Sequence, residues 1–388
     1  MPKIRKRILA IVRWPVGGIR TYLRYVYGKL DRERYSFTIV GPDTEEMRVL
    51  FTDIAHLDPV GIFSGDESDI SAFFRTAVKA ILSKKCDLIH SHGATAGMCS
   101  VVPAAVMRTP HVMTLHDVFN PEQFQGLKGL VKRTAMSAGF NLADCINPVA
   151  MAAKRNLLDY FPRLQYQEEK IVSINNGIEV DRFESPETRD FRSELGITDN
   201  VFLIGFFGRF MAQKGFVYLV DAIEAIVKKS KDLPMKPLVL TFGSGGFMRE
   251  DTNYIHKKGL TDYFHFLPFA PNIAPSLKGL DLVVMPSLWE ASGLLAMEAL
   301  VAGVPLVAST CGGLQDTIED SPATAIGPRD SQGLATAIAQ RMKNPGKAKA
   351  KAYVVQARER FDVRHTASAL DEVFTRLLAR KYAVASQR

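Results

Sequence analysis

Short apolar runs alternate with longer stretches in which apolar residues recur at helical spacing along most of the chain. The short runs are typical of buried strands and the longer stretches of helices that bury one face. The predicted strands are Ile8–Val12, Phe37–Val40, Leu88–Ile89, His111–Leu115, Ile171–Ile174, Phe202–Phe207, Leu238–Phe242, Phe264–Leu267, Leu282–Met285 and Leu306–Ala308. The predicted helices include Ile19–Leu30, Ile70–Ser83, Leu127–Phe140, Phe216–Lys228 and Leu294–Val301. This alternation indicates parallel, doubly wound sheets.

The number of strands and the chain length both indicate two domains. A chain of 388 residues exceeds the roughly 250–300 residues at which a single core stops growing. A polar stretch from Glu179 to Asn200, which contains Pro186, separates the two sets of strands and is interpreted as the connection. We therefore expect an α/β protein of two doubly wound Rossmann-like domains, residues 1–185 and 186–360, facing each other across a cleft.

Composition narrows the class of protein. Apolar residues make up 47% and charged residues 23% of the chain, which is typical of a globular protein. No segment reaches the ~18 uninterrupted apolar residues that a membrane span needs. The apolar run from Ile8 to Val12 is shorter than the core of a secretory signal, so we expect a cytoplasmic protein. The four cysteines form no CxxC pair and are predicted to be free thiols.

The net charge of +8 is concentrated near the N-terminus. Residues 1–40 hold ten lysines and arginines against two acidic residues, a surplus of eight that equals the charge of the whole chain. Such a basic face can contact anionic lipid headgroups, on the inner face of the membrane, or a phosphorylated acceptor, or it can simply be solvated. Nucleic acid is not expected as a partner, because the run lacks interleaved aromatic residues and known nucleic-acid-binding motifs.

Chemically suggestive residues follow the predicted strands in both halves. In open α/β sheets, ligands bind beyond the carboxyl ends of the strands. Glycine pairs there allow close approach of a phosphate to backbone N–H groups. The residues in these positions are Gly17, Gly18, His90, His92, His116, Gly208, Arg209, Lys214, Gly243, Ser244 and Glu290.

The segment Leu294–Ala302 is apolar on every face except at Glu298. A helix that is apolar all round is buried. A carboxylate on such a helix is costly unless an internal partner or a ligand compensates it. Gly293 lets a ligand approach the N–H groups of Leu294 and Leu295, where a diphosphate would meet the helix dipole. Arg209 and Lys214 are candidates to neutralise that diphosphate.

Metal ligands and covalent nucleophiles give no recognisable pattern. The chain contains no Asp-x-Asp, so no metal is needed to hold a diphosphate, and no cofactor is predicted. His90 and His92 lack a third ligand at a recognisable spacing. No Ser/His/Asp or Cys/His arrangement is recognisable either.

Together these motifs resemble the retaining GT-B-fold glycosyltransferases of glycosyltransferase family 4. Trp289–Ala299 is similar to that family's E-x7-E signature, with Glu290 and Glu298 as its two carboxylates. The resemblance spans nearly the whole chain. It continues at Gly303–Ala308, Gly312-Gly313, Gly208-Arg209, Lys214-Gly215, Gly243-Ser244-Gly245, Asn176-Gly177-Ile178, Gly17-Gly18 and His116-Asp117.

The resemblance implies roles for these residues. Glu290 would contact hydroxyls of the donor sugar, and Glu298 would hold the ribose hydroxyls of the nucleotide. Arg209 and Lys214 would stabilise the departing diphosphate, and His116 would lie beside the sugar and the reacting phosphate. The remaining residues expected to line the donor site are Gly17, Gly18, Gly208, Gly243, Ser244, Phe266, Leu267, Ser292, Gly293, Leu294 and Leu295.

The resemblance also implies an N-terminal acceptor domain, a C-terminal donor domain, and a last helix, near residues 361–388, that packs on the N-terminal domain. Two positions depart from the family's pattern: Ser292 stands where an aromatic residue is usual, and Pro268 where glycine is common. Both would line the donor site, so the sugar and the base stay open.

The implied function is metal-independent, retaining transfer of a hexose-type sugar to a hydroxyl acceptor in cell-envelope polysaccharide or glycoconjugate biosynthesis. The donor is a nucleotide sugar, with UDP favoured over GDP. The acceptor can be a glycan or a lipid-linked molecule. Two alternatives remain at this point: a nucleotide-sugar 2-epimerase of the same architecture, and a non-catalytic protein that docks on a membrane. The acceptor, the linkage and the oligomeric state are not predicted.

Overall fold

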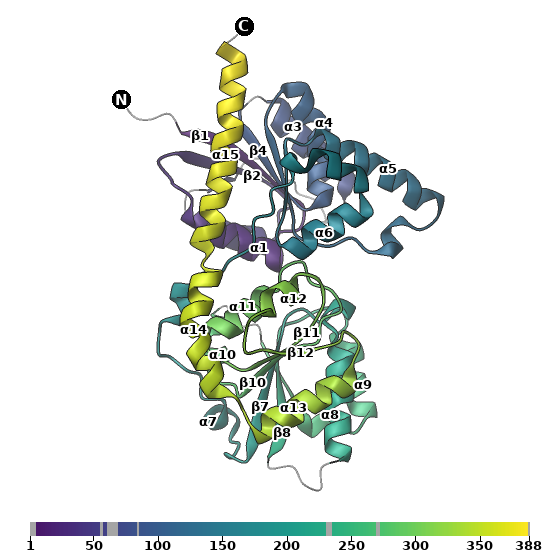
Figure 1. Ribbon diagram of the computed structural model, residues 1–388, viewed down its shortest axis with the longest axis vertical. Helices are drawn as coiled ribbons and strands as arrows, with labels where there is room; N and C mark the ends of the chain where they lie inside the picture. The colour runs from purple at the N-terminus through teal and green to yellow at the C-terminus, as the bar shows by residue number, and fades with distance from the viewer. Residues whose placement is uncertain are drawn as a thin grey trace. The chain divides into compact units, whose positions relative to one another are not determined.

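The computed structural model describes residues 5–54, 57–59, 69–83, 85–229, 235–268 and 272–386. The chain divides into two compact units (Figure 1). Unit 1 comprises Met1–Gly177 and Val363–Arg388, and unit 2 comprises Ile178–Asp362. All four cysteines are buried free thiols, as predicted. Within the described ranges, no helix is both long and apolar enough to cross a membrane.

Unit 1 is built on a six-stranded parallel sheet. Its strands lie in the order β3 (Leu57–Pro59), β2 (Tyr35–Val40), β1 (Lys6–Val12), β4 (Leu88–His92), β5 (His111–Leu115) and β6 (Cys145–Pro148). Every residue of β4, β5 and β6 is buried, which is the pattern of strands covered on both faces. The order reverses between β1 and β4, where Ile8 pairs with Leu88.

The helical elements of unit 1 connect successive strands, and the last one returns from the end of the chain. They are α1 (Gly18–Tyr22), η1 (Leu23–Tyr27), α2 (Glu45–Asp53), α3 (Ile70–Leu82), α4 (Ala94–Met107), η2 (Pro121–Phe124), α5 (Gly126–Leu142), α6 (Met151–Tyr160), η3 (Pro162–Lys170) and α15 (Val363–Ser386). Helix α15, yellow in Figure 1, packs within unit 1: Asp371 pairs with Arg34 at 2.7 Å, and the Phe374 ring lies 5.8 Å from the Tyr35 ring.

Unit 2 repeats this plan with a second six-stranded parallel sheet. Its strands lie in the order β12 (Thr324–Ile326), β11 (Leu306–Ser309), β10 (Leu282–Met285), β7 (Val201–Phe207), β8 (Lys236–Phe242) and β9 (Phe264–Leu267). Read from β9, this is the 3-2-1-4-5-6 order that unit 1 also has. The order reverses between β7 and β10, where Ile204 pairs with Leu282.

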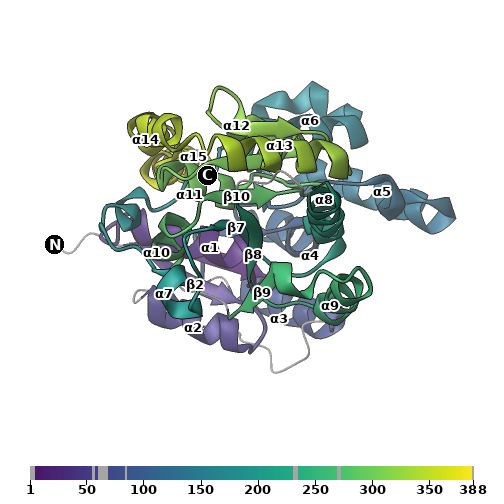
Figure 2. The same ribbon diagram turned by 90° about the horizontal axis from the view of Figure 1, so that it is seen from below.

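Helices cover the unit-2 sheet, as Figure 2 shows. Helices α8 and α13 pack against each other and bury a core that includes Phe206, Leu219 and Ile338. The helical elements of unit 2 are η4 (Val180–Phe183), α7 (Phe191–Leu195), η5 (Ala212–Lys214), α8 (Phe216–Lys228), α9 (Met248–Lys257), η7 (Thr261–Tyr263), α10 (Ile273–Lys278), α11 (Leu294–Val301), α12 (Gly312–Ile318), α13 (Ser331–Lys343) and α14 (Lys347–Phe361).

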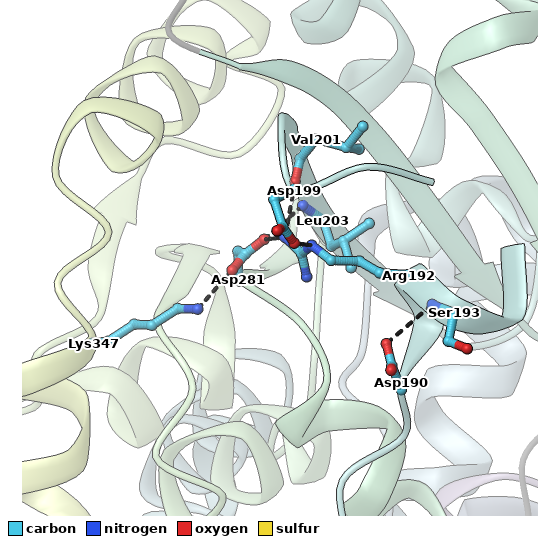
Figure 3. A network of polar contacts seen from close by, with 8 residues as sticks. All are labelled: Asp190, Arg192, Ser193, Asp199, Val201, Leu203, Asp281 and Lys347. Carbon is cyan, nitrogen blue, oxygen red and sulfur yellow. Dashed lines mark hydrogen bonds and ion pairs between the residues drawn. The ribbon is translucent and has the colours of Figure 1, made fainter. Parts of the chain in front are cut away.

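Asp281, at the start of β10, joins three segments of unit 2 (Figure 3). Its carboxylate accepts hydrogen bonds from Leu203 N–H at 2.9 Å and from Arg192 at 3.0 Å, and it pairs with Lys347 at 2.6 Å. Burial opposes ionisation of Asp281, but these donors outweigh it and hold its pKa below the usual range. The network therefore fixes α7 and α14 to the edge of the unit-2 sheet at which β10 begins.

The predicted fold class, two parallel doubly wound sheets, is confirmed. Three strands were missed, namely β3, β6 and β12, each of four residues or fewer. The predicted strand Ile171–Ile174 is wrong: this segment makes only an isolated bridge from Ile171 to Ile146. Each missed strand contains at most two apolar residues, whereas the similarly short β9, β10 and β11, which were predicted, contain at least three.

The expected connection between domains also differs from the structure. The stretch from Glu179 to Asn200 belongs to unit 2, where it forms η4 and α7. The division falls after Gly177, eight residues before the expected boundary at 185, and the chain returns to unit 1 at Val363. Ile178 N–H donates to Phe361 O at 2.8 Å, so the two crossings lie side by side.

Candidate active site

The loops after β7 and β8 in unit 2 pack backbone against backbone. Gly208 and Gly243 have φ of +133° and +145°, a region that favours glycine. A Cβ on Gly243 would lie 2.1 Å from the Gly208 carbonyl oxygen, so no larger residue fits there. Phe210 N–H donates to Ser244 O at 3.0 Å, which holds the two loops together. The predicted donor-site residues Gly208, Gly243 and Ser244 therefore lie beside one another.

Lys214 and Glu290, predicted as separate site residues, form an ion pair at the switch point of the unit-2 sheet. Lys214 Nζ lies 2.6 Å from Glu290 Oε1, and Ser287 Oγ donates to the same oxygen at 2.9 Å. Lys214 follows β7 and Glu290 follows β10, the two strands between which the order reverses. A Cβ on Gly215 would lie 2.0 Å from Pro286 O, so glycine is required for this close approach.

The backbone of Glu290 is fixed from a second direction by the start of α12. Gly313 N–H donates to Glu290 O at 2.8 Å. A Cβ on Gly312 would lie 2.5 Å from that oxygen, and one on Gly313 would lie 2.0 Å from Ala291 O. The two glycines thus let α12 approach the Glu290 loop, and the carboxylate is held at a defined place on the sheet edge.

Helix α11 begins at this loop with two available backbone donors. Gly293 caps the helix with φ +82°. The N–H groups of Leu294 and Leu295 belong to the first turn, which has no acceptor within the helix, and no other acceptor for them occurs in the described ranges. The half-buried backbone here provides the donors and the positive dipole end that an anion requires.

The buried Glu298 lies four residues after Leu294, one turn further along α11. Its side chain is 8% exposed, which confirms the prediction that the helix is buried. Glu298 is not without an interaction partner, so its burial does not by itself require a ligand. Ser292 differs: its buried Oγ has no hydrogen-bond partner in the described part of the chain, which is uncommon for a buried hydroxyl.

The other predicted residues of unit 2 are more exposed. Arg209 follows Gly208 and is exposed, and among the described residues its guanidinium has no ion-pair partner. Phe266 and Leu267 are half-buried in β9, with the Phe266 ring 5.7 Å from the Phe210 ring. Residues 269–271, just after Pro268, lie outside the described residues. Ser287 was not predicted, although it directly follows β10.

At the corresponding edge of unit 1, Gly17 and Gly18 follow β1 and are exposed. Gly17 has φ +55° and precedes α1. His116 follows β5, where its Nε2 lies 3.1 Å from His92 Nδ1, and its ring packs 4.8 Å from that of Tyr22. The structure thus places His116 in contact with a second histidine, and the sequence had suggested no such pair.

The buried His90, His92 and His111 of unit 1 and the half-buried His116 are kept uncharged by desolvation. Desolvation lowers the pKa of His111 and of His116 to about 3, and it lowers the pKa of His90 and of His92 well below the usual value. Within the described residues, no group of three His, Cys, Asp or Glu side chains could hold a metal ion.

The chain matches two glycosyltransferase family models. The model described as Glycosyltransferase Family 4 matches residues 16–182, and the model described as Glycosyl transferases group 1 matches residues 201–344. The first match begins just after β1 of unit 1, and the second spans β7 to β12 of unit 2. The chain belongs to the GT-B-fold glycosyltransferases of family 4.

Individual relatives agree with this assignment. The chain is 28% identical over 359 residues to the D-inositol 3-phosphate glycosyltransferase of Corynebacterium kroppenstedtii, a match that covers 83% of this chain and 76% of the relative. HepE of Anabaena, solved in complex with UDP-glucose, superposes with a TM-score of 0.77 at 23% identity, over 95% of this chain and 99% of HepE. The sucrose-phosphate synthase of Thermosynechococcus elongatus gives a TM-score of 0.77 at 20% identity, over 97% and 100% of the two chains. These matches do not favour the epimerase or the non-catalytic alternative.

The neutral histidines of the glycosyltransferase predict that it loses stability in mild acid. Each of the four stays neutral in the fold and takes up a proton on unfolding once the pH falls below about 6.5. The free energy of unfolding therefore falls as the pH drops through about 6.5, and its slope approaches about 1.4 kcal/mol per pH unit for each histidine below that pH. Asp251, whose pKa burial raises to about 6, acts in the opposite sense and offsets one of the four.

Urea unfolding at pH 7.5, 6.5 and 5.5 measures this slope. His111→Gln is the matched variant, because His111 Nε2 contacts only Ser91 Oγ at 2.7 Å among the described side chains. Between pH 7.5 and 5.5 its unfolding free energy should fall by about 1.4 kcal/mol less than that of the unsubstituted protein, because one histidine with an unfolded pKa of about 6.5 no longer contributes. An unfolding free energy that does not change over this range would contradict the neutral assignment.

Proposed function

We propose that the enzyme transfers a hexose-type sugar from a UDP-sugar to a hydroxyl acceptor with retention of anomeric configuration. The observation that carries the proposal is the Lys214–Glu290 ion pair beside the two free N–H groups at the start of α11. A cation, a carboxylate and a helix N-terminus at one switch point match a sugar diphosphate, which presents two anionic groups next to several hydroxyls.

In this proposal unit 2 binds the donor. The diphosphate accepts hydrogen bonds from the N–H groups of Leu294 and Leu295, and Arg209 and Lys214 neutralise its charge. Glu298 holds the ribose hydroxyls, as the family resemblance implies. The unpartnered Ser292 hydroxyl supports a polar ligand at this edge, since a ligand oxygen would satisfy it. Gly208, Gly243 and Ser244 form the loops near the sugar, and Phe266 with Leu267 flanks the base.

The chemistry rests on the leaving group. The acceptor hydroxyl attacks the anomeric carbon from the side on which the diphosphate departs, and the departing phosphate oxygen takes the hydroxyl proton. No protein nucleophile and no metal is used. Lys214 then compensates negative charge that grows in the transition state, while Glu290 fixes the sugar through its hydroxyls. The ion pair between them holds both side chains in place at this edge.

We propose UDP as the nucleotide of the donor, a hexose as the transferred sugar, and a role in cell-envelope or glycoconjugate assembly. The UDP-glucose complex of HepE and the D-inositol 3-phosphate glycosyltransferases among the relatives support a UDP-hexose donor. Unit 1 is proposed to bind the acceptor. His116 and the backbone of Gly17 and Gly18 lie at the carboxyl edge of its sheet, where ligands of such sheets bind.

Lys214→Met tests the leaving-group assignment. The variant loses a cation that acts mainly in the transition state. The activation free energy should therefore rise by about 2–4 kcal/mol, and turnover should fall roughly 30- to 1000-fold. Release of UDP from UDP-sugar in the presence of acceptor measures the rate. Lys228→Met is the control, because Lys228 makes a similar pair with Glu224 at 2.8 Å on the exposed face of α8. Equal turnover in the two variants would show that Lys214 does not stabilise the departing diphosphate.

We further propose that the enzyme works at an anionic membrane surface and that α5 makes the contact. The expected basic face of residues 1–40 is partly neutralised, because Arg7 pairs with Asp87 and Arg34 with Asp371. Helix α5, in contrast, exposes Leu127, Leu130 and Val131 by 78%, 58% and 62%. These three positions share one helix face, and α5 adds Lys128, Lys132 and Arg133 with no acidic residue.

Vesicle sedimentation tests the α5 contact. The protein should bind vesicles that contain phosphatidylglycerol more strongly than vesicles of phosphatidylcholine alone, because cations attract anionic headgroups. Replacing Leu127, Leu130 and Val131 together by serine should weaken this binding at least tenfold. Val102→Ser with Val106→Ser is the control, since these valines are also exposed, by 57% and 71%, on the uncharged helix α4. Equal binding by both variants would argue against α5.

A further inference from the structure

A continuous line of hydrogen bonds runs behind His116 inside unit 1. His116 Nε2 lies 3.1 Å from His92 Nδ1, and His92 Nε2 lies 2.9 Å from the Tyr27 hydroxyl. The same hydroxyl lies 2.8 Å from His90 Nδ1, and His90 Nε2 lies 2.7 Å from Thr114 Oγ1. The line therefore passes from β5 through two imidazoles and one phenol to the sheet edge.

A π-helical turn explains how Tyr27 reaches both histidines. Residues 23–27 form η1, which directly continues α1. In an α-helix, residues five apart point about 140° away from each other. The i→i+5 pattern of a π-turn brings such residues close to one face, so Tyr22 and Tyr27 both contact the histidines. Local departures of this kind are frequent at functional sites.

Asn147 fixes one end of the line. Ile174 N–H donates to Asn147 Oδ1 at 3.0 Å, which identifies the other amide atom as nitrogen. Asn147 Nδ2 donates to Thr114 Oγ1 at 3.1 Å. Thr114 has one hydroxyl hydrogen, and His90 Nε2 lies within hydrogen-bond distance of its Oγ1. The Tyr22 hydroxyl also faces Thr114, but it makes no hydrogen bond of normal geometry with any described residue. If the Thr114 hydroxyl donates to His90, every hydrogen along the line has an acceptor.

The donor in each remaining hydrogen bond then follows step by step, because each neutral imidazole carries one N–H hydrogen. His90 accepts at Nε2 and donates from Nδ1 to Tyr27, and Tyr27 donates to His92 Nε2. His92 donates from Nδ1 to His116 Nε2. In the reverse direction, Thr114 would accept from both Asn147 and His90, and its own hydrogen could turn only to the Tyr22 hydroxyl, which makes no hydrogen bond of normal geometry with any described residue.

We propose that Thr114, His90, Tyr27 and His92 are positioning residues that fix His116 as its Nδ1–H tautomer. His116 thereby offers the reaction an uncharged hydrogen-bond donor and not a base. Burial keeps the line neutral, as the lowered pKa values of all three histidines indicate. A sugar hydroxyl or a phosphate oxygen is the kind of group that such a donor binds. This last step rests on the proposed function, whereas the tautomer does not.

The tautomer is measured directly by imidazole nitrogen chemical shifts of the ¹⁵N-histidine-labelled full chain, without substrate. The His116 signal is identified as the one lost in His116→Asn. We expect the Nδ1–H pattern for His90, His92 and His116 alike. The Nε2–H pattern at His116 would overturn the proposal, whether or not the protein transfers sugar.

Tyr27→Phe tests the consequence for the reaction. Without the hydroxyl the tautomer of His92 is no longer set, so the His116 signal should become a mixture and turnover should fall about three- to tenfold. Tyr35→Phe is the control, because the Tyr35 hydroxyl contacts Thr375 Oγ1 at 3.5 Å outside the line. Thr114→Val breaks the line at its other end and replaces Tyr27→Phe if that variant does not fold.

These outcomes distinguish the role of the hydrogen-bond line from the proposed sugar transfer. If the His116 signal of Tyr27→Phe showed a mixture of tautomers but turnover were unchanged, the line would set the tautomer of His116 without affecting the reaction. That result would overturn the positioning role. Turnover that is absent even in the unsubstituted protein would count against the proposed function, while the tautomer pattern would still decide the direction of the line.

Discussion

The reversal of strand order in each sheet is the constraint on which the rest of the protein depends. At that point two neighbouring strands send their connections to opposite sides, which leaves their carboxyl ends uncovered by a helix. In unit 2 these strands are β7 and β10, and the loops that follow them carry Lys214 and Glu290. The proposed chemistry thus lies at the point where the strand order leaves the sheet edge uncovered.

Glycine makes this edge compact enough to hold a charged pair. Gly215, Gly243 and Gly312 each let one backbone approach another so closely that a Cβ would overlap a carbonyl oxygen. An ion pair that is largely withdrawn from water adds little net stability, because desolvation cancels much of the attraction. The Lys214–Glu290 pair is better understood as an arrangement that a sugar diphosphate can enter, exchanging one partner for another at little net cost.

The sequence predicted the fold well and indicated a candidate site at one edge of each sheet, because both inferences depend on local patterns. Continuous apolar runs such as Val201–Phe207 identify strands buried on both faces, and the glycines and charges after them identify the binding edge. The short strands β3, β6 and β12 each contain at most two apolar residues, so they show no apolar run of the kind that identified β9, β10 and β11. The pairing of Lys214 with Glu290 and the line from Thr114 to His116 join residues far apart in the chain. No spacing rule reveals such contacts.

The most direct test of the central claim, a nucleotide site along α11, is calorimetric titration of UDP. Glu298→Gln keeps the shape of the buried side chain but removes its charge, so UDP affinity should fall roughly tenfold, the weight of one charge-assisted hydrogen bond. Glu290→Gln should bind UDP as the unsubstituted enzyme does, because its carboxylate is assigned to the sugar. Unchanged UDP affinity in Glu298→Gln, with the fold intact, would contradict the account.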